Sequence, residues 1–479
     1  MKILGGRVKP GHGEEGASVM KNILRIALLA LFLAAPAAAQ TAPALNGDWD
    51  GALAVQAGTT LRLSLHVETT ATGQSAKLVS VDQGGAIVPV SAITKIGSQI
   101  IFNMPSAGAT FQALLSTDSN TLFGSFTQGG VPRPLSLARR AAGAIAPVDI
   151  KRPQEPQRPF PYREEDVVYP SAGGAVLAGT LSLPEGSGKF PAVLLIGGSG
   201  PNNRDEGVFG HKPFLLLADY LTRRGIAVLR VDKRGIGKST GNFSQATSAD
   251  FATDVKAGVA LLKARRDIGK IGLLGHSEGG EIAPMVAADD PSIAFVVLMA
   301  GPGVRGDVLM PMQIRRIGRA DGISDSVLDF AVSLTSKRYA AIESASDTAD
   351  AIAKQRAVLI ANSPVAGNAV PDLQLAATSS PWYRFFLAYD PAPALARVKC
   401  PVLALNGDKD LQVDAVQNLT AIKAALSGNK DATIMTLPGL NHLFQTAKTG
   451  SPSEYVNIEE TIAPSVLATI GDWIVKHTR

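Results

Sequence analysis

The stretch that decides the fold runs Ile271-Gly-Leu-Leu-Gly275-His276-Ser277-Glu278-Gly279-Gly280. Its apolar beginning predicts a buried strand, and its centre has the pattern G-x-S-x-G. The glycines on either side of Ser277 allow a sharp turn from this strand into a following helix. Such a turn lifts the serine hydroxyl out of the sheet, and the helix N-terminus favours negative charge beside it. Placed between a strand and a helix, the pattern predicts Ser277 as a nucleophile.

The sequence around this stretch alternates between strand and helix patterns. Over residues 250–265, apolar residues recur at the spacing of one helix face. Continuous runs of Val, Ile and Leu are typical of parallel strands covered on both faces. These runs predict strands at residues 192–196, 226–231, 271–274, 293–300, 402–405 and 432–437. The pattern predicts a doubly wound α/β domain over residues 166–479.

A long insert interrupts the alternation at about residues 303–385. Helical patterns near residues 309–319, 326–344 and 349–361 predict a helical cap. We expect this cap to lie over the carboxyl ends of the strands, where such sheets bind ligands. Near its end lie four aromatic residues, which either line a substrate pocket or form the core beneath the cap. The sequence leaves both interpretations open for Trp382, Tyr383, Phe385 and Phe386.

A serine hydroxyl becomes a good nucleophile only when a base removes its proton, and position singles out one of the six histidines. His276 adjoins the serine and points elsewhere, while His211 precedes a nucleophile that should come before both acid and base. The remaining excluded histidines lie near a chain end or in another region: His12, His66 and His477. His442 follows the strand at residues 432–437 in a loop containing glycine, where the base is expected.

The acid that orients this histidine is expected in the loop Asn406-Gly407-Asp408-Lys409-Asp410. Asp410 is favoured over Asp408, because a residue at the tip of the loop reaches across toward the His442 loop. Asp408 would then form the turn.

An oxyanion hole requires two backbone N–H groups. Glu278, which follows the nucleophile, supplies one by position. The Gly-rich turn Gly197-Gly-Ser-Gly-Pro201 after the strand at residues 192–196 supplies the other. Ser199 N–H is the first candidate, and Gly198 N–H is the alternative. These glycines do not predict a phosphate site, since neither a Lys-Ser/Thr pair nor G-x-G-x-x-G follows.

Residues 45–140 form a separate block with a different pattern. Short runs that alternate apolar and polar residues recur about every ten residues, separated by Gly, Ser, Asn and Asp. Leu61, Leu63, Leu65 and Val67, for example, alternate with polar residues. The block therefore predicts a small all-β domain, either an antiparallel sandwich or a small barrel. Five prolines between residues 147 and 161 then predict an extended linker over residues 141–165.

The N-terminal residues 1–39 predict an export signal. Lys21 and Arg25 precede an apolar run of ten residues, and Ala37-Ala38-Ala39 supplies a cleavage pattern, with Met20 as a candidate start. The run is too short for a permanent membrane span. Residues 1–39 hold five Lys/Arg and two Asp/Glu, so without them the net charge falls from +5 to +2. We therefore expect a periplasmic or secreted protein that does not bind nucleic acid.

From residue 166 onward the sequence resembles the bacterial α/β-hydrolase esterases related to dienelactone hydrolases and to the catalytic domain of prolyl oligopeptidases. The resemblance rests on five stretches: Gly197–Pro201 with Arg204-Asp205, Asp232–Ser239, Gly275–Gly279, Cys400–Asp410 and Gly439–His442. It implies that the acid lies three residues after the loop glycine, which supports Asp410. It also implies a structural turn without a catalytic role at Asp232–Ser239. Asn46-Gly-Asp-Trp-Asp-Gly51 resembles small β-rich modules found before such hydrolases.

We therefore expect an α/β-hydrolase with a helical cap that cleaves small carboxylic esters through Ser277, Asp410 and His442. A secreted peptidase of the prolyl-oligopeptidase type is the alternative, although roughly 95 residues before the linker cannot form the propeller of that group. A non-catalytic binding protein on the same fold is the third possibility. No cofactor or metal is expected, because the single cysteine, Cys400, excludes a site built from several cysteines. The sequence predicts neither acyl length nor oligomeric state.

Overall fold

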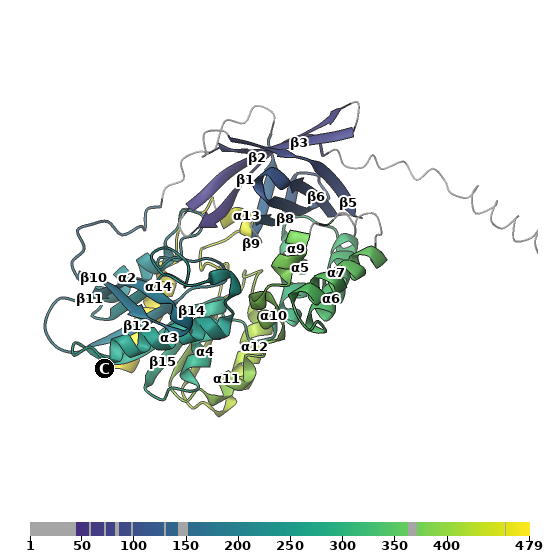
Figure 1. Cartoon of the computed structure of the whole chain (residues 1–479). Helices are drawn as coiled ribbons and strands as arrows, with labels where there is room; N and C mark the ends of the chain where they lie inside the picture. The colour runs from purple at the N-terminus through teal and green to yellow at the C-terminus, as the bar shows by residue number, and fades with distance from the viewer. Residues whose placement is uncertain are drawn as a thin grey trace, which may run out of the picture. The chain divides into compact units, whose positions relative to one another are not determined.

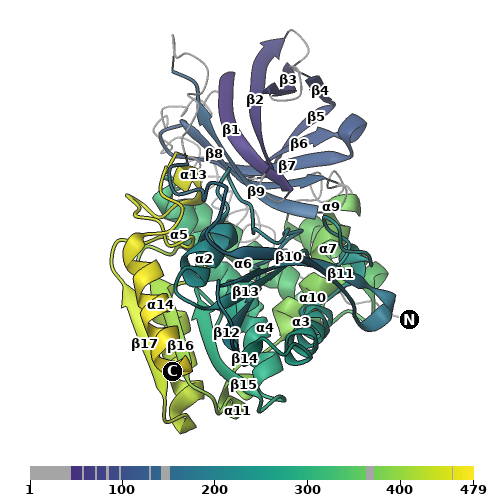
Figure 2. The same cartoon turned by 90° about the vertical axis from the view of Figure 1, so that its left-hand side faces the viewer.

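A computed structural model describes residues 45–479 except 57–58, 71–72, 82–85, 97–98, 129–130, 142–151, 363–369, 371 and 456 (Figures 1 and 2). The predicted export signal and much of the predicted linker lie outside the described residues. Residues 46–479 form one compact unit, to which all the elements below belong.

The N-terminal region of this unit is a nine-stranded antiparallel sheet in the order β4-β3-β2-β1-β9-β8-β7-β6-β5. Leu63, Leu65 and Val67 of β2 are buried, as their alternation with polar residues predicts. The all-β prediction is confirmed, with the strands in one sheet rather than the two sheets of a sandwich. The strands are β1 (Gly47–Gln56), β2 (Thr59–Thr70), β3 (Gly73–Ser80), β4 (Ala86–Val90), β5 (Ala92–Ile96), β6 (Gln99–Met104), β7 (Ala109–Leu115), β8 (Thr121–Gln128) and β9 (Val131–Arg139).

The second sheet has eight strands in the order β10-β11-β13-β12-β14-β15-β16-β17. From β13 to β17 neighbouring strands are parallel, whereas β10 and β11 join the edge in antiparallel pairing. This arrangement confirms the predicted α/β-hydrolase fold. The strands are β10 (Arg163–Pro170), β11 (Val176–Leu183), β12 (Phe190–Ile196), β13 (Ala227–Val231), β14 (Ile268–His276), β15 (Ile293–Met299), β16 (Val402–Gly407) and β17 (Ala432–Leu437).

Helices cover both faces of this sheet, as Figure 2 shows. In β12, Val193 and Leu195 pack with α2 (Pro213–Thr222) and α14 (Pro464–Thr478). The alternate residues Leu194 and Ile196 pack on the opposite face with α3 (Ser248–Lys263), α4 (Glu278–Ala287), α11 (Ala392–Arg397) and α12 (Ala415–Ala425). Burial on both faces explains why these strands are continuous apolar runs.

The insert between β15 and β16 forms a helical cap: α5 (Gly306–Ala320), α6 (Asp325–Glu343), α7 (Thr348–Asn362), α9 (Asp372–Thr378) and α10 (Pro381–Ala388). Its green helices lie beside the blue strands of the N-terminal sheet in Figures 1 and 2. Leu114 of β7 packs against Leu328 of α6, and Thr117 Oγ1 donates to the carbonyl of Gly322 at 2.6 Å. The sheet and the cap therefore share apolar contacts and a hydrogen bond.

The short helix α13 (Pro452–Tyr455) precedes α14 in the C-terminal part of the chain. Within the described residues, no helix combines the length and apolarity needed to cross a membrane.

Candidate active site

Ser277 lies in a strained turn between strand β14 and helix α4. Its φ of 53° and ψ of −120° are unfavourable for a residue with a side chain, and its N–H donates to Met299 O at 2.9 Å. The flanking glycines permit close backbone approach, because a Cβ on Gly275 would lie 1.9 Å from the carbonyl oxygen of Gly279. The predicted strand–turn–helix geometry at Ser277 is therefore present.

His442 lies in the loop after β17 and contacts the acid from the neighbouring strand β16. Its Nδ1 lies 2.8 Å from Asp410 Oδ2, and Asp410 is fully buried. The other carboxylate oxygen, Oδ1, accepts the backbone N–H groups of Gln412 and Val413 at 2.8 and 2.9 Å. Asp408 instead accepts the N–H of Gly439 at 2.7 Å and holds the turn. The structure thus brings Asp410, and not Asp408, to His442.

Ser277 and His442 line the same cavity. Among the described residues no hydrogen bond joins the Ser277 hydroxyl to the imidazole. Catalytic hydrogen bonds of this kind often tighten only when substrate is bound.

The Gly-rich turn after β12 lies beside Ser277, since a Cβ on Gly198 would be 3.1 Å from Ser277 Cβ. The N–H of Gly198 donates to Glu206 Oε1 at 2.5 Å, so this donor is already engaged. The carbonyl of Gly198 accepts from Asn202 Nδ2 and from Lys233 Nζ, each at 2.6 Å. In a trans peptide, the N–H of Ser199 points opposite to that carbonyl and therefore away from Lys233.

Lys233 connects the two parts of the predicted oxyanion hole. Besides the Gly198 carbonyl, its Nζ binds Glu278 Oε2 at 2.9 Å, at the first residue of α4. The buried Glu278 carboxylate also accepts from Ser248 Oγ and Trp382 Nε1, each at 2.7 Å. The sequence predicted no catalytic role for the Asp232–Ser239 loop, and the contacts of Lys233 were not predicted. The sequence signal for Lys233 was a lysine two residues after the end of β13, a strand that neighbours β12 in the sheet.

His276 forms a second histidine–carboxylate pair next to the predicted base. Its Nδ1 lies 3.0 Å from Glu206 Oε1, and its Nε2 lies 3.0 Å from the backbone oxygen of His442. Both partners can accept hydrogen bonds, so a ring protonated on both nitrogens can donate to each of them. Burial disfavours that charge, but Glu206 and the hydrogen bonds outweigh burial and raise the pKa of His276. Sequence reasoning placed this side chain away from the serine and missed its contact with the His442 loop.

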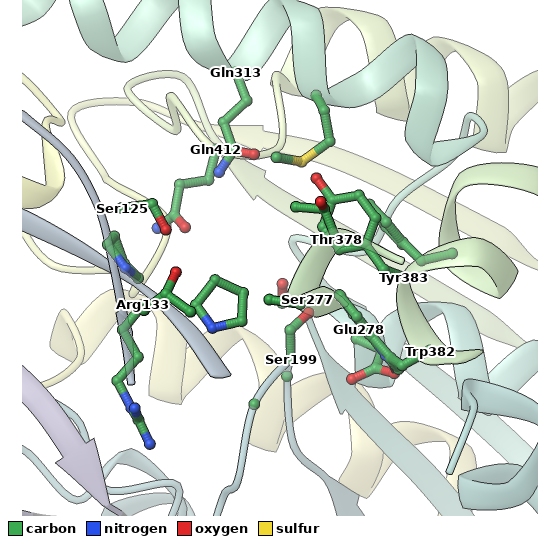
Figure 3. Close-up of a pocket in the computed structure, with 18 of the residues that line it drawn as sticks. Ser125, Arg133, Ser199, Ser277, Glu278, Gln313, Thr378, Trp382, Tyr383 and Gln412 are labelled. Atoms are coloured by element: carbon green, nitrogen blue, oxygen red, sulfur yellow. Dashed lines mark hydrogen bonds between the residues drawn. The ribbon is translucent and has the colours of Figure 1, made fainter. Parts of the chain in front are cut away.

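The cavity beside Ser277 has a volume of about 820 Å³. Its wall is formed by side chains of the N-terminal sheet, of the α/β domain and of the cap. Trp382, Tyr383 and Phe386 of α10 line it, and Trp382 stacks on Phe386 with ring centroids 5.3 Å apart. Phe385 instead stacks on Tyr389. Figure 3 shows Ser125 and Arg133 of the N-terminal sheet across the cavity from Thr378 and Tyr383, with Ser277 and Ser199 at its base.

The other candidate groups are held in structural contacts. His211 bonds Thr461 and Gln445, and burial, with Arg152 nearby, lowers its pKa to about 4. Cys400 is a half-buried free thiol whose pKa burial raises to about 11. In the part of the chain that the structure describes, no cluster of three His, Cys, Asp or Glu side chains is placed to hold a metal ion.

The chain is similar in sequence to several known proteins. The family described as serine aminopeptidase, S33, matches residues 212–446. Esterase EstD of Thermotoga maritima is 27% identical over 319 residues, covering 66% of this chain and 69% of its own length. Esterase FrsA of Yersinia pestis is 26% identical over 193 residues, which cover 36% of this chain and 43% of FrsA.

Two solved structures are also similar. Esterase Pf2001 of Pyrococcus furiosus is 14% identical, with 69% of this chain and 98% of that one covered and a TM-score of 0.41. Dienelactone hydrolase from Anabaena variabilis is 17% identical, with 67% and 100% covered and a TM-score of 0.38.

The sheet order, the strained serine after β14 and the acid and histidine loops after β16 and β17 define an α/β-hydrolase. The sequence relatives EstD and FrsA are named esterases.

Proposed function

We propose that the chain is a serine carboxylesterase that cleaves small esters through an acyl-enzyme, with Ser277, His442 and Asp410 as its triad. One observation carries the proposal. The buried Asp410 carboxylate lies 2.8 Å from Nδ1 of His442, and His442 lines the same cavity as the strained Ser277. This arrangement leaves Nε2 as the nitrogen that exchanges protons.

In the first half of the reaction, Ser277 Oγ attacks the ester carbonyl carbon and its proton passes to His442 Nε2. The tetrahedral intermediate then expels the alcohol, which takes that proton from the imidazolium. Water attacks the acyl-enzyme in the second half, with His442 as base, and Ser277 regains its proton as the acid leaves. Asp410 holds Nδ1–H and stabilises the imidazolium in both halves.

The N–H groups of Glu278 and Ser199 are the proposed donors to the oxyanion. Glu278 begins α4, so its N–H has no carbonyl partner inside the helix. The engagement of Gly198 N–H by Glu206 favours Ser199 N–H over the Gly198 alternative. Loss of one donor of this kind typically costs about 10²- to 10³-fold in turnover.

The test is a panel of p-nitrophenyl esters, assayed with wild type, Ser277→Ala, His442→Ala and Asp410→Asn. Loss of a triad member should lower kcat by roughly 10⁴- to 10⁶-fold. His66→Ala, in the N-terminal sheet and outside the cavity wall, is the matched histidine control and should retain activity. Undiminished ester hydrolysis by Ser277→Ala would overturn the proposal, and full activity of Asp410→Asn would reject that acid.

A secreted serine peptidase is the second candidate, favoured by the match to the serine aminopeptidase model. The relatives EstD and FrsA are named esterases, which favours ester hydrolysis over peptide hydrolysis. Aminoacyl-p-nitroanilides in the same panel discriminate the two. Faster Ser277-dependent cleavage of an anilide than of every ester would establish the peptidase.

Export to the periplasm or the medium is part of this proposal and rests on residues 20–39 of the sequence. Expression of the full chain followed by cell fractionation and N-terminal sequencing tests it. The expected product begins at Gln40 in an exported fraction. Uncleaved protein confined to the cytoplasm would contradict export.

A further inference from the structure

Arg338 of α6 lines the cavity that holds Ser277, yet its hydrogen bonds reach only neutral groups. Nε and Nη2 donate to Gln355 Oε1 at 3.2 and 2.8 Å, and Nη2 also donates to Thr378 Oγ1 at 3.3 Å. Within the described residues, Nη1 has no hydrogen-bond partner and the guanidinium forms no ion pair. Burial lowers the pKa of Arg338, because no carboxylate of the described residues lies close enough to offset the cost of burying the charge.

The guanidinium is held by a rigid support. Gln355 is fully buried, and its Nε2 donates to Ser379 Oγ at 2.7 Å, which directs Oε1 toward Arg338. Thr378 Oγ1 donates to the same Oε1 at 2.9 Å. Because Nε and Nη2 are engaged by this support, Nη1 is the group left for a ligand.

Three other poorly exposed arginines of the described chain are paired with carboxylates. Arg234 binds Asp254, Arg204 binds Asp232, and Arg230 binds Glu164 and Asp205. An unpaired charge removed from water costs several kcal/mol unless a counter-ion accompanies it. Arg338 departs from this rule at the wall of the reaction chamber, where a substrate can supply the counter-ion.

The remaining charges of the cavity wall favour an anion. Its two described carboxylates, Glu206 and Glu278, are already paired with His276 and Lys233. Arg133 of β9 is a second lining cation with no hydrogen bond or ion pair to the described residues. Figure 3 shows Arg133 on the opposite side of the cavity from Thr378, with its guanidinium directed away from Ser277. The lining charges that lack an ion-pair partner among the described residues are therefore positive. Of these two arginines, Arg338 has the guanidinium that Gln355 and Thr378 hold in place.

We propose that the chamber takes esters bearing a free carboxylate and that Arg338 binds this carboxylate through Nη1. The inference rests on the proposed ester hydrolysis at Ser277 and names its substrate class. Arg338 acts in binding, so its loss should appear mainly in KM for the anionic ester.

The test compares two matched pairs of substrates. Mono-p-nitrophenyl succinate and p-nitrophenyl butyrate differ by a carboxylate in place of the terminal methyl group of the acyl chain. 4-(Butyryloxy)benzoate and phenyl butyrate place the carboxylate on the alcohol side instead. Wild type should prefer the anionic member of at least one pair, and added salt should weaken that preference.

Arg338→Met keeps an unbranched side chain but removes the guanidinium and its charge. It should lower kcat/KM for the preferred anionic ester by about 10- to 100-fold, the range expected for a hydrogen bond to a charged group. The neutral partner ester should change by less than about threefold by the same reasoning. Arg338→Lys should recover part of the preference. Arg356→Met is the matched control, because Arg356 of α7 pairs with Asp372 and lies outside the cavity wall.

The outcomes separate this inference from the proposed function. Two results would overturn the carboxylate site alone. One is Ser277-dependent hydrolysis with no preference for either anionic ester. The other is an equal loss of kcat/KM on both esters of a pair in Arg338→Met. Hydrolysis that survives Ser277→Ala overturns the proposed function. A second readout is the unfolding temperature with succinate added, which should rise in wild type and stay constant in Arg338→Met if the site exists.

Discussion

His276 Nε2 lies 3.0 Å from the backbone carbonyl oxygen of His442, so the residue before the proposed nucleophile holds the loop of the proposed base. Through Nδ1 the same ring binds Glu206, whose Oε1 also accepts the N–H of Gly198. One imidazole ring thereby connects the serine turn, the histidine loop and the Gly-rich turn. His276 is a positioning residue, since it acts through the groups that touch substrate.

The first prediction concerns this connection. His276→Ala should lower kcat by about 10- to 100-fold and leave KM within about twofold, because a misplaced catalytic group costs rate rather than binding. Steady-state kinetics on a p-nitrophenyl ester measures kcat and KM separately. His477→Ala, on the C-terminal helix, is the matched control. A parallel loss in KM with unchanged kcat would contradict a positioning role.

The second prediction concerns pH. The pKa of His276 in the folded chain lies above its ordinary value of 6.5, with Glu206 and then Asp410 as the carboxylates that raise it against burial. The folded state therefore holds the proton more tightly, and the stabilisation is fully present below about pH 6.5. As pH rises through the raised pKa, the free energy of unfolding should fall by up to about 1.4 kcal/mol per pH unit from this group.

Urea unfolding of wild type and His276→Gln from pH 6 to 9 measures this contribution. The difference between the two should shrink as pH rises, because the variant has no proton to lose at this position. A difference that grows with pH would show that the ring is neutral in the folded state.

The sequence predicted the features that depend on local pattern. Continuous apolar runs predicted the parallel strands, and the Gly275–Gly280 stretch predicted the turn at Ser277. Strand β10 was not predicted, because Arg163–Pro170 is a polar edge strand with a partner on one side only. The linker was accordingly predicted to extend to residue 165, whereas β10 begins at Arg163.

The sequence favoured Asp410 over Asp408 as the partner of His442, and the fold places Asp410 against His442 and Asp408 against Gly439. Other contacts between distant segments were not predicted. The roles of Lys233 and Arg338 also depend on long-range packing, since one acts across neighbouring strands and the other from the cap. Local periodicity carries no information about such contacts.

The third prediction concerns Lys233. Lys233→Met should lower kcat by roughly 10- to 100-fold, because Gly198 loses a partner on its carbonyl and the adjacent N–H of Ser199, the proposed oxyanion donor, becomes less fixed. It should also destabilise the fold by about 3 kcal/mol, since the buried Glu278 carboxylate loses its counter-ion. Ester kinetics and urea unfolding measure the two effects.

The double variant Lys233→Met/Glu278→Gln separates them. Removing the unpaired charge should restore most of the stability, while kcat should stay low because the Gly198 carbonyl still lacks its lysine. Recovery of kcat together with stability would assign Lys233 a purely structural role.

The fourth prediction concerns Glu281, one turn after Ser277 on α4. Both of its carboxylate oxygens are buried without a hydrogen-bond partner among the described residues, and burial, with Glu278 nearby, raises its pKa well above 4.5. Its folded state therefore favours the protonated acid, and stability is lost as pH rises from about 4.5 through the raised pKa. Each pH unit in that window costs about 1.4 kcal/mol.

Glu281→Gln should remove this loss, because a neutral amide of the same shape has no proton to release. The variant should unfold at a higher temperature than wild type at pH 8, with a gain of about 1 kcal/mol or more in free energy of unfolding. The gain should disappear at pH 4, where both side chains are neutral. Glu185→Gln, at an exposed loop position, is the control for the loss of one negative charge and should show no such pH dependence. A lower unfolding temperature for Glu281→Gln at pH 8 would mean that the carboxylate is ionised and stabilised inside the fold.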